Sequence, residues 1–289
     1  MSELIVDYNR QAIHLVRPVQ NMSWKTLENL SDNPDWIIQQ KHDGIHALYI
    51  SGHGLTRDGN NYFDNKFPEL IPYLKQLPDN TIIEGEIVCK CQEQEICNMA
   101  SSRLKQNNPK KKDLESEFIV FDILFCNGEN VQNMNYKDRL ELLNKLFSEI
   151  AINKFLRIIN QENKIMSKDE CGQQGVEGYI ARKNGRYSDE CLKFKAWDES
   201  DFIVTGYEAT ATKDIGVLNI ETLDGIKSGN VTYNNKFGDP KLQSTKDMLE
   251  NRPIAIVRSL PSWIIYNQKP KKADNLRFPV LVDLRIGET

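Results

Sequence analysis

A lysine, an aspartate and a glycine stand close together near residue 40. The sequence Lys41-His42-Asp43-Gly44 lies between two apolar runs, 36–38 and 47–50, of the kind that form short strands. The lysine is therefore expected on a strand-to-strand connection, which we interpret as a hairpin. Gly44 suits a turn that needs positive φ or a close backbone approach, and Asp43 can accept hydrogen bonds from turn amides. Taken alone, the tetrad is more often an ordinary hairpin tip than a functional site.

Three later segments, 81–88, 176–183 and 191–197, place charged residues within otherwise apolar strand patterns. Side chains two positions apart lie on the same face of a strand. Buried charges are costly unless they are paired, bind a metal or face a ligand. We therefore expect the three strands to contribute to a common site. The residues that share a face in each segment are Glu84 with Glu86, Glu177 with Lys183, and Lys193 with Lys195.

In this order, the charged segments resemble the motif series of the covalent nucleotidyltransferases. Within that superfamily the chain looks most like a compact ATP-dependent DNA ligase of the kind encoded by viruses and phages. The resemblance runs from about residue 17 to the 277–285 ending, nearly the whole chain. The motifs that carry it are Lys41-x-Asp43-Gly44, Glu86, Phe121-Asp122, Glu177-Gly178-x-x-x-x-Lys183 and Lys193-x-Lys195.

The resemblance implies an α+β fold with two domains. Residues 1–200 would form an adenylation (nucleotidyltransferase) domain, ATP-grasp-like, with antiparallel sheets and flanking helices. Residues 201–289 would form an OB-fold β-barrel, and the pattern agrees, because several short strands joined by turns follow residue 201. Apolar spacing predicts helices near 23–30, 67–77 and 136–147, and the apolar run 117–125 predicts a strand buried on both faces.

The resemblance also implies a reaction. Lys41 would be the catalytic nucleophile that attacks the α-phosphate of ATP and expels pyrophosphate, leaving a lysyl-AMP. AMP would pass to the 5′-phosphate of a nick in duplex DNA, and the neighbouring 3′-hydroxyl would displace it. A free lysine is protonated at neutral pH. We expect Lys183, Lys193 and Lys195, if they line the same pocket, to favour the neutral amine of Lys41 by like-charge repulsion, as would a bound metal ion.

Other residues receive roles by the same resemblance. Lys193 and Lys195 would hold the α-phosphate, and Arg285 would orient the pyrophosphate. Phe121 would stack on adenine, although core packing is an equal alternative. Glu86 and Glu177 would bind the ribose or act as metal ligands for Mg²⁺. The implied cofactor-binding residues are Gln39, Lys41, His46, Arg57, Glu86, Phe121, Glu177, Lys193, Lys195 and Arg285.

The chain departs from this pattern in three places. His46 stands where most relatives have arginine, and histidine carries a full charge only when protonated. Gln39 stands where many relatives have glutamate, and an amide could still pair with the adenine edge. The 208–216 connection is short and lacks the long basic insertion with which some viral ligases encircle DNA.

Composition limits the possible classes. The chain of 289 residues has a net charge of −4 and a sequence pI near 5.7, so DNA affinity would have to come from local patches. Two lysine clusters, at 105–112 and 269–272, are candidates, although solvated loop lysines explain them equally well. The sequence shows no secretory signal and no membrane-spanning run, and we expect a cytoplasmic protein.

The six cysteines show no CxxC pair, which indicates reduced thiols and no zinc module. NAD-dependent ligases carry such a module, so ATP is the expected nucleotide. Alternative readings are an RNA ligase, an mRNA-capping nucleotidyltransferase and a non-catalytic nucleic-acid binding module. The Arg277 to Arg285 ending resembles the DNA ligases and favours that reading. A monomer is expected only as the family default.

Overall fold

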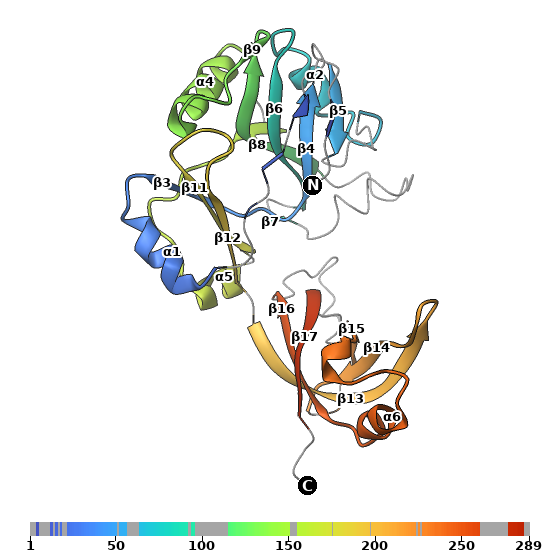
Figure 1. Cartoon of the computed structure of the whole chain (residues 1–289). Coiled ribbons are helices and arrows are strands. Elements are labelled where there is room, and N and C mark those ends of the chain that lie inside the picture. The colour runs from blue at the N-terminus through green and yellow to red at the C-terminus, as the bar shows by residue number, and fades with distance from the viewer. Residues whose placement is uncertain are drawn as a thin grey trace. The chain divides into compact units, whose positions relative to one another are not determined.

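The computed structural model describes residues 4–5, 12–13, 15–16, 18, 22–50, 52–56, 64–91, 94–95, 115–150, 155–174, 176–196, 198–223, 225, 227–260 and 277–285. The chain divides into two compact units (Figure 1). The first unit comprises Met1–Met166 and Val176–Phe194, and the second comprises Ser167–Gly175 and Lys195–Thr289. Among the described residues, no helix is both long and apolar enough to span a bilayer.

The first unit is built around a seven-stranded sheet of order β10-β8-β6-β4-β5, in which β7 pairs with β6 and β9 with β8. Its strands are β4 (Ile45–Ile50), β5 (His53–Thr56), β6 (Ile82–Cys91), β7 (Gln94–Glu95), β8 (Glu115–Cys126), β9 (Glu129–Asn130) and β10 (Leu156–Ile158). The long strands β4, β6 and β8 pair antiparallel, and β10 runs parallel to β8. The strand expected at 117–125 is confirmed, because residues 116–125 are buried except for Phe121.

The two faces of β6 differ in chemistry. Ile83 and Ile87 point into the main core, which also contains side chains of α2 (Ile71–Leu74) and α4 (Tyr136–Ser148). Glu84 and Glu86 lie on the opposite face, as their two-residue spacing predicted. The helix expected over 67–77 is only one turn long and begins at Ile71, because a helix that began earlier would need an amide at Pro72.

A second sheet of three strands has the order β12-β11-β3. Its strands are β3 (Trp36–Gln40), β11 (Gly178–Lys183) and β12 (Cys191–Lys195). Helix α1 (Trp24–Ser31) contacts β3 and begins at Ser23, whose Oγ accepts a hydrogen bond from the Thr26 amide at 3.3 Å. Strands β1 (Leu4–Ile5) and β2 (Ala12–Ile13) form a separate antiparallel pair.

The hairpin expected around Lys41 is wrong. Strand β3 belongs to the three-stranded sheet and β4 to the seven-stranded sheet, so residues 41–44 connect two sheets. The Lys41 amide donates to the Gly178 carbonyl at 2.8 Å, which keeps the chain beside β11 for one residue past β3. At Gly44 the chain then reaches β6 so closely that a Cβ would lie 2.1 Å from the Ile87 carbonyl oxygen. Close backbone approach, rather than a hairpin, therefore accounts for this glycine.

The second unit contains a closed five-stranded barrel of order β13-β14-β15-β17-β16 (Figure 1). The strands are β13 (Asp198–Thr210), β14 (Lys213–Glu221), β15 (Lys227–Thr232), β16 (Ile254–Leu260) and β17 (Arg277–Arg285). Alternating apolar residues such as Val204, Leu218 and Val257 fill its core. One of the short strands that the sequence predicts after residue 201, at 263–266, lies outside the described residues.

Among the residues that the structure describes, three short helical elements belong to the second unit. Helix α6 (Gln243–Glu250), which the sequence patterns did not predict, packs against β13. A 3₁₀ turn, η2 (Asn235–Phe237), precedes it, and α5 (Lys168–Gln174) groups with this unit although it lies earlier in the chain. The division between the units after Phe194 falls within β12, several residues before the expected domain boundary.

Candidate active site

Lys41 lies against the carboxylate of Glu177. Its Nζ donates to Glu177 Oε2 at 2.8 Å, and the Glu177 side chain is only 3% exposed. Glu177 immediately precedes β11, where Gly178 has a φ of 142°, a value that favours glycine. Because the Lys41 amide also bonds to the Gly178 carbonyl, backbone and side chain together hold the lysine at the junction of the two sheets.

The charge state of Lys41 is opposite to the expectation from neighbouring lysines. Burial lowers its pKa, but the carboxylates of Glu177, Glu86 and Asp43 outweigh burial, and the pKa is raised above its ordinary value. The expectation that like charges keep the amine neutral is therefore wrong for this structure. Lys41 is an ammonium group here, and it must lose a proton before it can act as a nucleophile.

Glu86 supplies a second carboxylate. Its Oε1 accepts a hydrogen bond from the Gly44 amide at 3.1 Å. Burial raises the pKa of Glu86, as do the carboxylates of Glu177 and Asp43, whereas Lys41 and His46 act against them. The carboxylates of Glu86, Glu177 and Asp43 thus all act on the Lys41 ammonium group.

The fit of this acidic cluster to Mg²⁺ follows from its ligand chemistry. Within the described ranges, no group of three or more His, Cys, Asp or Glu side chains is arranged to hold a metal ion. Glu86 and Glu177 nevertheless offer hard oxygen ligands, and Mg²⁺ is commonly held by one or two carboxylates together with substrate phosphates. The residues present therefore suit a metal that arrives with a nucleotide rather than a permanent metal cage.

His46 is held by Glu84, on the same face of β6 as Glu86. His46 Nε2 and Glu84 Oε1 are 2.5 Å apart, and the Tyr187 hydroxyl donates to Glu84 Oε2 at 2.7 Å. Burial alone would raise the pKa of Glu84, but His46, Arg182 and Tyr187 outweigh it and the pKa is lowered. Glu84 is thus an ionised anchor that positions the His46 ring.

Phe121 occupies a β-bulge. Glu84 pairs with Asp122 and Gly85 pairs with Val120, so Phe121 is an extra residue in β8. The bulge explains why Phe121 alone is only half-buried within this stretch of the strand. Its ring centroid lies 5.6 Å from that of His46 and 4.7 Å from Cζ of Arg182. The phenylalanine therefore faces charged and polar groups instead of the apolar core.

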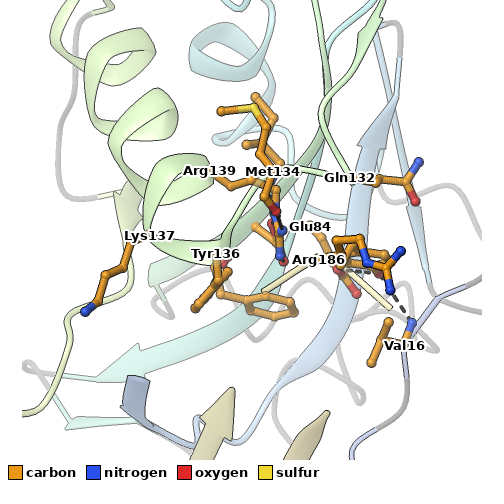
Figure 2. Close-up of polar contacts among 12 residues, drawn as sticks. Val16, Glu84, Gln132, Met134, Tyr136, Lys137, Arg139 and Arg186 are labelled. Atoms are coloured by element: carbon orange, nitrogen blue, oxygen red, sulfur yellow. Dashed lines mark hydrogen bonds and ion pairs between the residues drawn. The ribbon is translucent and has the colours of Figure 1, made fainter. Parts of the chain in front are cut away.

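A buried ion pair fixes the strand next to this bulge. Arg139 on α4 donates to both carboxylate oxygens of Asp122, at 2.7 and 3.1 Å, and its remaining nitrogen donates to the carbonyls of Met134 and Gly185. Both side chains are almost fully buried. Figure 2 shows Arg139 beside Met134, with Glu84 and Tyr136 in the same cluster. This pair ties α4 to β8 and to the chain after β11.

The other expected site residues are placed less completely. Gln39 is buried in β3, and its Oε1 lies 2.9 Å from the Tyr136 hydroxyl. Lys193 and Lys195 are half-buried on β12, but Lys195 groups with the second unit. Arg285 is exposed at the end of β17, also in the second unit. Arg57 and both lysine clusters lie outside the described residues. The residues that the structure brings together are Gln39, Lys41, His46, Glu86, Phe121 and Glu177.

Sequence reasoning missed three residues of this cluster. Counting in steps of two along β11 predicted Lys183 as a site residue, but the strand ends at Lys183 and its side chain is exposed. The guanidinium of Arg182 instead lies over the rings of Phe121 and Tyr136. Tyr136 and Arg139 lie on α4, a helix that apolar spacing predicts but for which the sequence indicated no site residue. Their three-residue spacing on the buried face, in line with Leu143, was the available signal that α4 turns an arginine inward.

Fold and site together define a mixed α/β protein whose candidate centre is a lysine held between carboxylates where two sheets meet. The model of the ATP dependent DNA ligase domain family matches residues 14–196, which is more than half of the chain. The chain therefore belongs to this family, and the resemblance inferred from its motifs is confirmed.

Curated relatives agree with this assignment. A probable DNA ligase of Koribacter versatilis is 29% identical over 122 residues, which are 40% of this chain and 21% of that protein. The bifunctional non-homologous end joining protein LigD of Bacillus subtilis is 23% identical over 249 residues, 75% of this chain and 40% of that protein. The matches thus span well under half the length of these relatives.

Solved structures show a similar fold. One from a study of Lig E DNA ligases, described as DNA binding with a minimal scaffold, superposes with a TM-score of 0.60 at 17% identity. That match covers 94% of this chain and 100% of the other chain. Another, described as Pmar-Lig_Pre., has a TM-score of 0.65 at 16% identity over 93% of this chain and 67% of its own. At such identities the likeness concerns the fold.

Proposed function

We propose that this chain is an ATP-dependent DNA ligase that seals nicks between a 3′-hydroxyl and a 5′-phosphate in duplex DNA. The observation that carries the proposal is Lys41 at the junction of two sheets, 2.8 Å from the buried Glu177 carboxylate. Membership of the ligase family supports it. The reaction would proceed through a lysyl-AMP intermediate and then a DNA 5′ end that carries AMP.

In the first step, the neutral amine of Lys41 would attack the α-phosphorus of ATP. A P–N bond forms, the bond to the β-phosphate oxygen breaks, and pyrophosphate leaves. The raised pKa of Lys41 means that its proton must first pass to solvent or to a neighbouring carboxylate. Glu177, already in hydrogen-bond contact, is the nearest acceptor that the structure provides.

The remaining residues would bind and orient the nucleotide. Phe121 would stack on adenine, and Lys193 with Lys195 would stabilise charge on the α-phosphate. Glu86 and Glu177 would contact the ribose or hold Mg²⁺, which supplies neutralisation of the triphosphate charge when bound. His46, Arg57 and Arg285 keep their expected phosphate contacts as part of this proposal.

The barrel would be the OB-fold domain and would grip DNA. Its strand order, the parallel pairing of β15 with β17 and the helix between β15 and β16 support this assignment. We place the domain boundary near residue 200 and take the protein to act as a monomer in the cytoplasm, where ATP and DNA are both present. The alternative function is the same nucleotidyl transfer acting on RNA, as in an RNA ligase or an mRNA-capping nucleotidyltransferase.

Label transfer from radioactive ATP tests the first step. We expect wild type to become covalently labelled in denaturing gels and Lys41→Ala to lose the label completely, because no other amine occupies its position. Lys41→Arg should also fail, since a guanidinium is not deprotonated in this pH range. Lys75→Ala changes an exposed lysine that directly follows α2, and this matched control should be labelled normally. Full labelling of Lys41→Ala would overturn the assignment.

Sealing assays distinguish the substrates. Matched nicked duplexes of DNA and RNA are incubated with ATP, GTP or NAD, and the joined strand is measured. Sealing of nicked DNA with ATP is the expected result. Preferential sealing of RNA, or guanylylation of RNA ends, would favour the alternative nucleotidyltransferases. Label transfer without any joining would remove the ligase function while leaving the lysine chemistry intact.

A further inference from the structure

Gln39 has one end of its amide without a hydrogen-bond partner. The side chain is 1% exposed, its Oε1 lies 2.9 Å from the Tyr136 hydroxyl oxygen, and its Nε2 is buried and unpaired. Buried polar groups in proteins are almost always hydrogen-bonded, so an unpaired end indicates another orientation, an ordered water or a ligand. Around Gln39 the number of available protons requires another orientation of the amide. The end that then remains unpaired is left for a ligand.

The Tyr136 hydroxyl decides the orientation. Its oxygen is also 2.6 Å from the backbone carbonyl oxygen of Phe121. A hydroxyl has a single proton and cannot donate to two oxygens at once. The backbone carbonyl can only accept and is the nearer of the two, so the Tyr136 hydroxyl donates its proton to the Phe121 carbonyl oxygen. The hydroxyl remains protonated at any working pH, because burial raises the pKa of Tyr136.

The Gln39 amide must then donate to Tyr136. The two ends of a carboxamide have nearly the same shape, and hydrogen bonding determines which end faces a neighbour. With Nε2 directed at the Tyr136 hydroxyl, a continuous chain runs from Gln39 through Tyr136 to the Phe121 carbonyl. The unpaired end of the amide is then Oε1, which can only accept.

The free acceptor belongs to the side of the chain that carries Lys41, where the proposed function puts the nucleotide. The pairing of β3 with β11 continues to Lys41, so Gln39 and Lys41, two residues apart, lie on one face of the extended chain. The bulged Phe121 is joined to the same hydrogen-bond chain. Adenine presents an amino donor at C6, whereas guanine presents a carbonyl acceptor there. An acceptor on the protein favours the first and repels the second.

We propose that Tyr136 is a positioning residue that fixes the Gln39 amide with Oε1 toward the nucleobase, and thereby selects a 6-amino purine nucleotide over a 6-oxo purine nucleotide. This inference rests on the proposed function, because it assigns the base specificity of the same site. It requires no contact between Tyr136 and the nucleotide. The hydroxyl acts only through the orientation of its neighbour.

The test compares covalent labelling by radioactive ATP and GTP, using full-length protein first stripped of bound AMP with pyrophosphate. We expect wild type to prefer ATP. Tyr136→Phe removes the hydroxyl but keeps the ring, so the amide can turn and the ATP-to-GTP ratio should fall roughly tenfold, the value of one neutral hydrogen bond. Tyr233→Phe, which removes a hydroxyl bonded to the Gly238 carbonyl in the barrel, should leave the ratio unchanged.

A rescue separates orientation from packing. Both oxygens of glutamate accept, so Gln39→Glu should keep the preference for ATP and should restore it when combined with Tyr136→Phe. An unchanged ratio in Tyr136→Phe, or no rescue, overturns the inference. If Tyr136→Phe does not fold, the labelling of wild type and of Gln39→Glu still tests the inference. A preference for GTP in either protein would contradict a Gln39 Oε1 that faces the nucleobase. Equal labelling of Lys41 by both nucleotides defeats only this inference, whereas no labelling at all defeats the proposed function.

Discussion

Glu86 is buried and lies near the carboxylates of Glu177 and Asp43, so holding it ionised has a stability cost. The raised pKa of Glu86 means that the folded protein holds its proton more tightly than the unfolded chain does. The sign follows by linkage: ionised Glu86 destabilises the fold, the penalty is absent below its unfolded pKa, and it grows as pH rises through the folded value. Removing this charge should therefore stabilise the nucleotide-free protein.

Glu86→Gln tests this at the scale of one residue. The variant keeps an oxygen that can accept from the Gly44 amide but carries no charge. We expect its melting temperature to exceed that of wild type at pH 7 and the difference to vanish near pH 4, the region of the ordinary carboxyl pKa. Thermal melts from pH 4 to pH 8 measure the difference. A gap that is constant with pH would show that charge is not its cause.

At the scale of elements, the connection from β3 to β4 depends on how closely Gly44 approaches β6. A Cβ there would lie 2.1 Å from the Ile87 carbonyl oxygen, and backbone cannot yield as a flexible side chain can. Gly44→Ala should push residues 41–44 away from β6. Because positioning dominates phosphoryl transfer, we expect a loss of label transfer of about 100-fold or more.

Gly206→Ala is the control for this prediction. Its Cβ would meet nothing nearer than 3.8 Å, so both stability and labelling should be retained. Label transfer and a melting curve are measured for each variant. If Gly44→Ala is labelled at the wild-type rate, close approach at this position does not position Lys41.

The junction between α4 and β8 depends on a buried ion pair. Arg139→Met leaves the Asp122 carboxylate buried without its main partner, which costs about 3–5 kcal/mol of unfolding free energy. Adding Asp122→Asn removes the orphaned charge and should recover part of the loss. Urea denaturation of the two single variants and the double variant measures the coupling.

Arg186 offers a comparison for that ion pair. Its Nη2 lies 3.8 Å from Asp189 Oδ1, and the two side chains are 65% and 31% exposed. Solvent screens such a pair, so Arg186→Met should cost no more than about 1 kcal/mol. Similar losses for Arg139→Met and Arg186→Met would argue that burial does not set the strength of the inner pair.

At the scale of the whole molecule, a variant of Arg285 tests what the barrel contributes to the reaction. It stands exposed at the end of β17, in a different unit from Lys41. If it orients pyrophosphate, it matters only while ATP is reacting. Arg285→Ala should then slow lysine labelling at least about tenfold and leave sealing of DNA that already carries 5′-AMP nearly unchanged. Both rates are measured on the full chain, and equal losses would indicate a structural role.

Several features followed from the sequence because they are local. Two-residue alternation placed Glu84 and Glu86 on one face of a strand, and helical spacing located α4. The ordered motifs identified the family. The same local rules missed the one-turn length of α2 and helix α6, because Pro72 and a weak polar pattern override simple spacing.

Tertiary structure alone decided the geometry of the site. Lys41 and Glu177 meet across 136 residues, and whether β3 pairs with β4 or with β11 depends on partners that spacing does not reveal. Likewise, the bulge at Phe121 and the inward turn of Arg182 depend on strand register and on where a strand ends. Spacing along a chain orients side chains relative to their own strand, whereas pKa values, ion pairs and hydrogen-bond chains arise from which strands pack together.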